Sequence, residues 1–211
     1  MTPAEEIYAE ELRALAAEDL LSPPPASPVL FYGSSSIRLW ETLAEDFPRM
    51  AVLNRGFGGS TLADCVEFAD LLVVPYAPRT ILFYAGDNDL DQGATPRQVL
   101  DRFKELVRIV RGSLGEVPVT FVAIKPSPSR WSNVAAIMET NNLVREFIGQ
   151  EKGLHFIDVF PAMLTAEGEP REDLYLEDGL HLNRAGYKLW TRLLLEQDEI
   201  WGTKTRRKRK P

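Results

Sequence analysis

The 211-residue sequence holds a single cysteine, Cys65, and only two histidines. One cysteine excludes an internal disulfide framework and a zinc site built on cysteine thiolates. The histidines, His155 and His181, lie far from each other in the chain and from the cysteine, so no cluster typical of a transition-metal site is present. We therefore expect no metal centre.

Long apolar runs are also missing. No segment reaches the roughly 20 residues that a membrane-spanning helix needs. Residues 1–18 are acidic and rich in alanine, and they show neither the basic start nor the apolar centre of a secretory signal. These absences predict no membrane span and a cytoplasmic location.

Positive charge is concentrated at one end of the chain. The net charge is −7, yet six basic residues lie between Lys204 and Lys210, so the remainder is more acidic than the net value indicates. An acidic body argues against a nucleic-acid-binding domain. We expect residues 203–211 to form a disordered basic tail, and nucleic acid or anionic lipid is the alternative use of such a tail.

The length fits one domain with short appendages. Thr2-Pro3-Ala4-Glu5 is a helix-start signature, with a cap, an early proline and an acid placed for a capping box. Three prolines at 23–25 predict the end of that helix. The expected organisation is an N-terminal helix and proline-rich connector over residues 1–25, followed by the main domain over residues 26–202.

Short apolar runs alternate with helical patterns in the main domain. The runs predict five strands that are buried on both faces, at 29–32, 51–54, 80–84, 117–124 and 154–158. Helices are expected from Pro96 to Gly112 after a Thr95 cap, over 133–148, and from about Asn183. This alternation predicts an α/β fold with a doubly wound parallel sheet, in which ligands bind at the carboxyl ends of the strands.

Familiar loop motifs at those strand ends are excluded by inspection. The glycines of residues 56–59 are not a dinucleotide fingerprint, because Thr61 occupies the place of the third glycine. No segment matches the phosphate-binding loop. Residues 33–37 are not a Gly-x-Ser-x-Gly elbow, because Ile37 occupies the final position.

A serine nucleophile fits the first strand end. The strand stops at Gly33, three serines follow, and apolar residues then recur at helical spacing. A hydroxyl in this turn lies where backbone N–H groups can stabilise a developing negative charge. The same serines are also good helix caps, and the turn alone does not decide between the two roles.

Partners for such a nucleophile occur at other strand ends. His181 is a candidate base, and Asp178 lies three residues before it and could orient its ring. Gly59 offers a backbone N–H and Asn88 a side-chain amide for an oxyanion hole. Each has an ordinary structural alternative: a structural histidine, a glycine turn, or an Asx turn.

In combination these blocks resemble the SGNH hydrolases, also called GDSL esterases and lipases. The matching blocks are Gly33-Ser34-Ser35, Gly59 within residues 54–60, Gly86-x-Asn88-Asp89, and Asp178-x-x-His181. They extend from Phe31 to His181 and look like a small bacterial subgroup, close to the platelet-activating-factor acetylhydrolase branch. Ser34 replaces the aspartate that is usual in the family, and that aspartate is not part of its triad.

The resemblance implies a flavodoxin-like three-layer sandwich with strand order 2-1-3-4-5. It implies Ser35 as the nucleophile, His181 as the general base and Asp178 as its partner. The N–H groups of Ser35 and Gly59 and the amide of Asn88 would then form the oxyanion hole. No metal or organic cofactor is needed for this chemistry.

We therefore expect a serine esterase that acts on a small-molecule ester with a short acyl group, an O-acetyl group being one candidate. Alternatives are a lysophospholipase or thioesterase, and a non-catalytic binding module with the same fold. Lys125 and Arg130 follow the fourth strand and could bind an anionic substrate group, or they could lie on a solvated loop.

Overall fold

The computed structural model describes residues 2–201. The expected basic tail, residues 203–211, lies outside the described residues, as does the last residue of the expected main domain. Within residues 2–201 no helix combines the length and apolar character needed to cross a membrane. The same residues contain no group of three or more His, Cys, Asp or Glu side chains arranged to hold a metal ion.

A single parallel sheet of five strands organises the chain. Its order is β2-β1-β3-β4-β5, which confirms the predicted flavodoxin-like arrangement. The strands are β1 (Val29–Gly33), β2 (Val52–Gly56), β3 (Thr80–Tyr84), β4 (Val119–Val122) and β5 (Leu154–Ile157). The fourth is shorter than the apolar run 117–124 predicted, because the sheet pairing covers only its centre.

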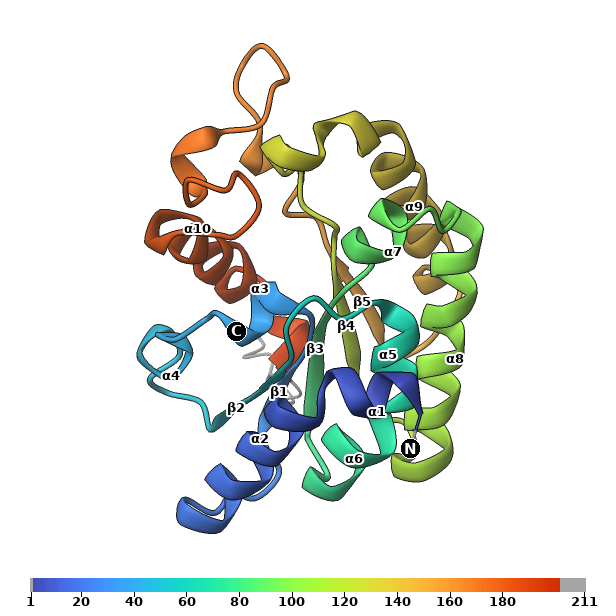
Figure 1. Cartoon of the computed structure of the whole chain (residues 1–211), viewed down its shortest axis with the longest axis vertical. Coiled ribbons are helices and arrows are strands. Elements are labelled where there is room, and N and C mark those ends of the chain that lie inside the picture. Colours follow the sequence, from blue (N-terminus) through green and yellow to red (C-terminus); the bar gives the residue numbers. More distant parts are fainter. Residues whose placement is uncertain (1, 202–211) are drawn as a thin grey trace, which may run out of the picture.

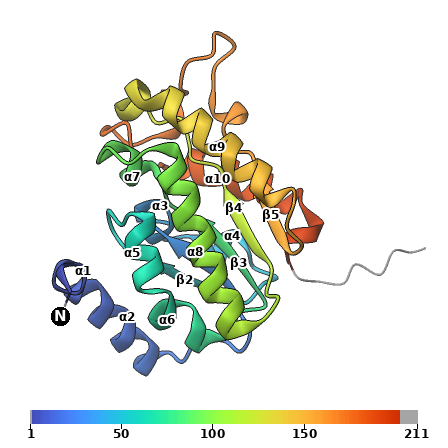
Figure 2. The ribbon, with the colours of Figure 1, turned by 90° about the vertical axis from the view of Figure 1, so that its right-hand side faces the viewer.

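Helices cover both faces of the sheet, as Figures 1 and 2 show. One face packs against α5 (Leu62–Glu67), α6 (Ala69–Leu72), α8 (Pro96–Leu114) and α9 (Val134–Ile148). The other packs against α3 (Ser35–Arg38), α4 (Leu43–Asp46) and α10 (Arg184–Leu195). Alternate strand residues enter the two cores: Leu30 and Tyr32 lie in the first, Val29 and Phe31 in the second. This is the predicted three-layer sandwich.

Local sequence signals set several helix ends. The Thr95 hydroxyl accepts the Gln98 N–H in a complete capping box, so α8 begins at Pro96 as predicted. The prediction that α8 ends at Gly112 is wrong, since the helix continues to Leu114. Gly115 is the residue that terminates it, with a φ of +72° that favours glycine. The helix α10 begins after Asn183, whose side chain accepts two backbone N–H groups.

The N-terminal segment forms two helices where one was predicted. α1 (Pro3–Ile7) carries the expected capping box between Thr2 and Glu5. The chain turns at Tyr8, and α2 (Ala9–Leu21) then runs to the proline connector. Tyr8 is buried, with its ring 4.9 Å from that of Phe57. The break therefore lies where the segment anchors on the main domain.

Short elements fill connections at both ends of the sheet. The helix α7 (Asp87–Asp91) follows β3 directly. The 3-10 turns are Val74–Tyr76, Pro128–Asn133, Pro161–Met163, Glu172–Leu174 and Asp198–Trp201. The turn Pro128–Asn133 follows β4 and borders the residues described next.

Candidate active site

The turn after β1 is shaped by Gly33. Its φ is +139°, and a Cβ atom there would lie 1.9 Å from the carbonyl oxygen of Tyr84 on the neighbouring strand. Only glycine fits this close approach. The next N–H, that of Ser34, donates to the same carbonyl at 2.9 Å. The turn therefore begins α3 at Ser35, at the carboxyl end of the central strands.

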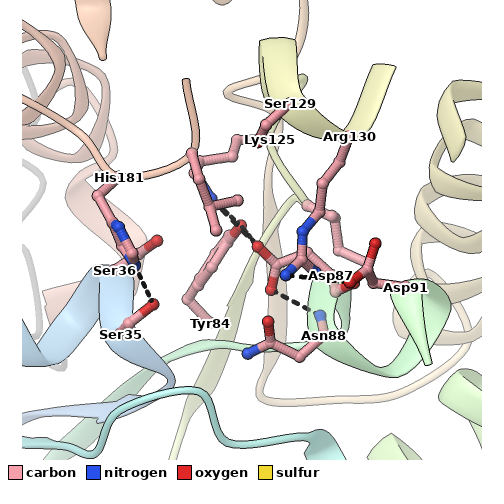
Figure 3. A network of polar contacts seen from close by, with 12 residues as sticks. Ser35, Ser36, Tyr84, Asp87, Asn88, Asp91, Lys125, Ser129, Arg130 and His181 are labelled. Carbon is pink, nitrogen blue, oxygen red and sulfur yellow. Dashed lines mark hydrogen bonds and ion pairs between the residues drawn. The ribbon is translucent and has the colours of Figure 1, made fainter. Parts of the chain in front are cut away.

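The structure separates the three serines of this turn. Ser34 and Ser36 are buried, and within residues 2–201 their hydroxyl oxygens have no hydrogen-bond partner. Ser35 is half-buried, and its Oγ lies 3.1 Å from Nε2 of His181 (Figure 3). Of the three hydroxyls, that of Ser35 is the one placed against a base.

Asp178 fixes the orientation of the His181 ring. Its Oδ2 lies 2.6 Å from Nδ1 of His181, while its Oδ1 accepts the backbone N–H groups of Leu180 and His181. Burial acts to raise the pKa of Asp178, but these donors outweigh it and hold the pKa at about 2. An ionised carboxylate accepts and does not donate, so Nδ1 carries the proton and Nε2 faces Ser35 as an acceptor.

A second loop holds the Asp178–His181 segment in place. The backbone N–H and the hydroxyl of Ser129 both donate to the carbonyl oxygen of Gly179, each at 3.1 Å. Behind His181, Leu182 pairs with Tyr175 in an isolated bridge. These contacts join the turn after β4 to the loop that carries His181.

Gly59 lies in the loop after β2, which leaves the sheet at the same edge as the turn that carries Ser35. Gly59 has a φ of +70°, and a Cβ atom there would meet nothing within 4 Å. The backbone conformation, rather than lack of space, therefore favours glycine. No residue in the described part of the chain accepts a hydrogen bond from the Gly59 N–H. That N–H is free to bind an oxygen atom of a ligand.

Asn88 lies on the first turn of α7, which follows β3 at the same edge of the sheet. Its Nδ2 donates to the carbonyl oxygen of Ser60 at 2.9 Å. This bond assigns the nitrogen end of the amide, and it uses one of the two N–H groups. It also ties Asn88 directly to the loop of Gly59, so the two candidate oxyanion donors are connected.

A buried ion pair supports the Asn88 segment, as Figure 3 shows. The Lys125 ammonium lies 3.1 Å from both Asp87 Oδ2 and the hydroxyl of Tyr84. The other oxygen of Asp87 accepts the Asn88 N–H at 3.0 Å, and Arg130 donates to the Asp87 carbonyl at 2.8 Å. Burial acts to raise the pKa of Asp87, but the charges of Lys125 and Arg130 outweigh it and lower that pKa.

These contacts change the interpretation of Lys125 and Arg130. The side chain of Lys125 is 1% exposed, so the alternative of a solvated lysine is wrong. Arg130 also has internal partners, because its second nitrogen lies 3.4 Å from Asp91. Direct binding of an anionic substrate group by either cation stays a prediction, and their internal pairing weighs against it.

Glu11 of α2 is a site neighbour that sequence reasoning missed. Its carboxylate accepts the Gly58 N–H at 2.6 Å, directly before Gly59. It also lies 3.6 Å from Arg38, the last residue of α3. Nothing in the sequence distinguishes Glu11 from the other acids of the N-terminal segment.

The sequence of the chain matches a known family over most of its length. The model of the GDSL-like Lipase/Acylhydrolase family matches residues 27–189. That span includes Ser35, Gly59, Asn88, Asp178 and His181, and it excludes α1 and α2. No curated protein matches the chain in sequence.

Several solved structures share the fold. A protein from Streptococcus pneumonia, provisionally described as a platelet activating factor, is 21% identical with a TM-score of 0.78, over 89% of this chain and 91% of that one. A GDSL-like lipase from Bacteroides thetaiotaomicron is 18% identical with a TM-score of 0.73, and the match covers 88% of this chain and 95% of that one. The lipase/acylhydrolase from Enterococcus faecalis is 22% identical with a TM-score of 0.63, and the match covers 82% of this chain and 95% of that one.

Proposed function

The chain belongs to the GDSL-like lipase/acylhydrolase family of ester hydrolases, and on that premise we propose that it cleaves a carboxylic ester through an acyl-enzyme on Ser35. The observation that carries the proposal is the continuous chain of contacts from the Ser35 hydroxyl through His181 to Asp178, at 3.1 Å and 2.6 Å. A binding module with no turnover would have no use for a base and a carboxylate aligned on one accessible serine.

The first half of the reaction forms the acyl-enzyme. Ser35 Oγ attacks the carbonyl carbon of the ester while its proton moves to Nε2 of His181. The oxygen that becomes negative is stabilised by the N–H groups of Ser35 and Gly59 and by the free N–H of the Asn88 amide. The C–O bond to the alcohol then breaks, and the alcohol leaves with the proton from His181.

The second half releases the acid. His181 takes a proton from water, the resulting hydroxide attacks the acyl carbon, and Ser35 regains its proton when the carboxylic acid departs. Asp178 remains ionised throughout, because its pKa is about 2, and it stabilises the imidazolium form of His181. No step requires a metal or an organic cofactor.

We further propose a short acyl group, acetyl foremost. A hollow of about 520 Å³ lies between the turn Pro128–Asn133 and the loop of His181, with Glu172, Glu177 and Asp178 in its lining. Neither Ser35 nor His181 lines this hollow, so it offers no apolar pocket to a long acyl chain held on the nucleophile. A lysophospholipid or a thioester is the alternative substrate.

A panel of p-nitrophenyl esters from acetyl to palmitoyl tests both levels of the proposal. We expect wild-type kcat/KM to peak at acetyl or butyryl. The Ser35→Ala and His181→Ala variants should lose on the order of 10⁴-fold or more. A peak at palmitoyl would contradict the short acyl group, and full activity in Ser35→Ala would contradict the nucleophile.

A further inference from the structure

Glu11 connects the two backbone segments that carry the proposed nucleophile and one oxyanion donor. One oxygen of its carboxylate accepts the Gly58 N–H, and the other faces Arg38 of α3. Gly58 immediately precedes Gly59, and Arg38 lies three residues after Ser35. Glu11 belongs to α2, outside the family-matched residues 27–189.

The helix that carries Glu11 is attached to the main domain on both sides of Glu11. On one side the Tyr8 hydroxyl donates to Asp64 at 3.2 Å, and the Tyr8 ring packs on Phe57. On the other side Asp19 accepts the Tyr76 hydroxyl at 2.6 Å and forms an ion pair with Arg55 of β2. The carboxylate of Glu11 is therefore presented by a helix that cannot easily shift.

The Gly58–Gly59 segment needs such a restraint. Two consecutive glycines have the greatest backbone freedom of any dipeptide. The Ser60 hydroxyl donates to the Phe57 carbonyl across them at 3.0 Å, but no described residue binds the Gly59 N–H itself. A Cβ atom at Gly58 would lie 2.9 Å from both Arg38 Nε and Glu11 Oε1, which shows how closely the three residues approach. A carboxylate bound to the Gly58 N–H restrains the dihedral angles that aim the next peptide group.

We propose that Glu11 is a positioning residue that aims the Gly59 N–H at the oxyanion by holding Gly58 against Arg38. The inference rests on the proposed function, because it assigns a role within that oxyanion hole. Glu11 contacts no reacting atom; it acts through the peptide that it binds. A modest misalignment of a catalytic donor lowers the rate by about 10-fold or more.

The test compares Glu11→Ala and Glu11→Met with Glu10→Ala in hydrolysis of p-nitrophenyl acetate. Glu10 is the matched control, since it is exposed on the same helix and its side chain has no hydrogen bond or ion pair within residues 2–201. We expect both Glu11 variants to lose about 10-fold in kcat with little change in KM or Tm. Glu10→Ala should behave as wild type.

Glu11→Gln separates positioning from a general effect of charge. Its amide oxygen can still accept the Gly58 N–H. Because the hydrogen bond is kept, this variant should retain roughly a third or more of the wild-type kcat. A kcat in Glu11→Ala and Glu11→Met equal to that of Glu10→Ala would overturn the inference. Unfolding of both Glu11 variants beside a folded Glu10→Ala would also overturn it, because Glu11 would then be purely structural.

Wild type and Ser35→Ala are measured in the same series. An inactive wild type, or an active Ser35→Ala, refutes the proposed function itself. An active wild type and an inactive Ser35→Ala, combined with fully active Glu11 variants, refutes only the role of Glu11.

Discussion

The two candidate oxyanion donors beyond Ser35 are held by opposite means. Asn88 is held from the protein interior by the Asp87–Lys125 ion pair, in which the side chains of Asp87 and Lys125 are 6% and 1% exposed. Gly59 is supported from outside by Glu11 and Arg38, whose side chains are 34% and 44% exposed. The first support is part of the protein core, and the second is a surface contact from an N-terminal helix.

This difference predicts different consequences of losing each support. Removing one member of a buried ion pair leaves the other charge without water or partner, so stability falls together with activity. Removing the partly exposed carboxylate of Glu11 leaves the more exposed Arg38 hydrated, so stability changes little. The bond from Asn88 to the Ser60 carbonyl joins the two sides, and damage to the buried side is expected to reach the loop of Gly59 as well.

The largest expected effect comes from Lys125→Met. This change leaves the Asp87 carboxylate buried without its main partner, and we expect the free energy of unfolding to fall by about 3–5 kcal/mol. Urea unfolding measures the loss. Lys188→Met is the control, since Lys188 is exposed and has no ion pair within residues 2–201. Equal unfolding midpoints for the two variants would show that the buried pair does not support the fold.

Asn88→Ala should have the next largest effect, and mainly on the rate. Loss of one oxyanion donor lowers kcat by roughly 10²–10³-fold. The lost hydrogen bond to Ser60 should cost only about 1 kcal/mol of stability. Steady-state hydrolysis of p-nitrophenyl acetate and urea unfolding measure the two quantities, with Asn142→Ala on the exposed side of α9 as the control. An Asn88→Ala enzyme with wild-type kcat would remove Asn88 from the oxyanion hole.

The smallest expected effect is a pH dependence confined to the buried side. The pKa of Asp87 is lowered in the folded protein, so its ionisation contributes stability above the unfolded pKa of about 3.9. That contribution disappears as the pH falls through the lower folded value. The double variant Asp87→Asn/Lys125→Met lacks it, so the difference in unfolding free energy between wild type and double variant should be constant well above about pH 4 and should change steadily in favour of the double variant as the pH falls below about 4. A difference in unfolding free energy that stays the same from about pH 6 to about pH 3, a range that includes the ordinary pKa of an aspartate, would contradict the pairing.

The sheet could be predicted because its signals are local. Continuous apolar runs mark strands that are covered on both faces, and the Thr95–Gln98 box marks the start of α8 within four residues of sequence. The end of α8 was misplaced because both Gly112 and Gly115 are plausible stops from sequence. Only the positive φ at Gly115 distinguishes them.

The candidate site was predictable only in part. The order of the motifs indicated Ser35, Asp178 and His181, yet the choice among three serines depended on the family resemblance. The burial of Lys125 was not predictable, since a lysine in a sequence does not reveal an aspartate 38 residues away in the chain. The Glu11–Gly58 contact joins residues that are 47 positions apart in the chain, and no sequence pattern in either segment predicts it.

Covalent labelling with a fluorophosphonate, followed by mass mapping of the modified peptide, tests the central claim most directly. Our account predicts one adduct per chain, on Ser35, that forms neither in Ser35→Ala nor in His181→Ala. Ser34 and Ser36 should remain unmodified because they are buried. No adduct on the wild-type protein, or an adduct on another residue that persists in Ser35→Ala, would contradict the assignment of Ser35 as the nucleophile.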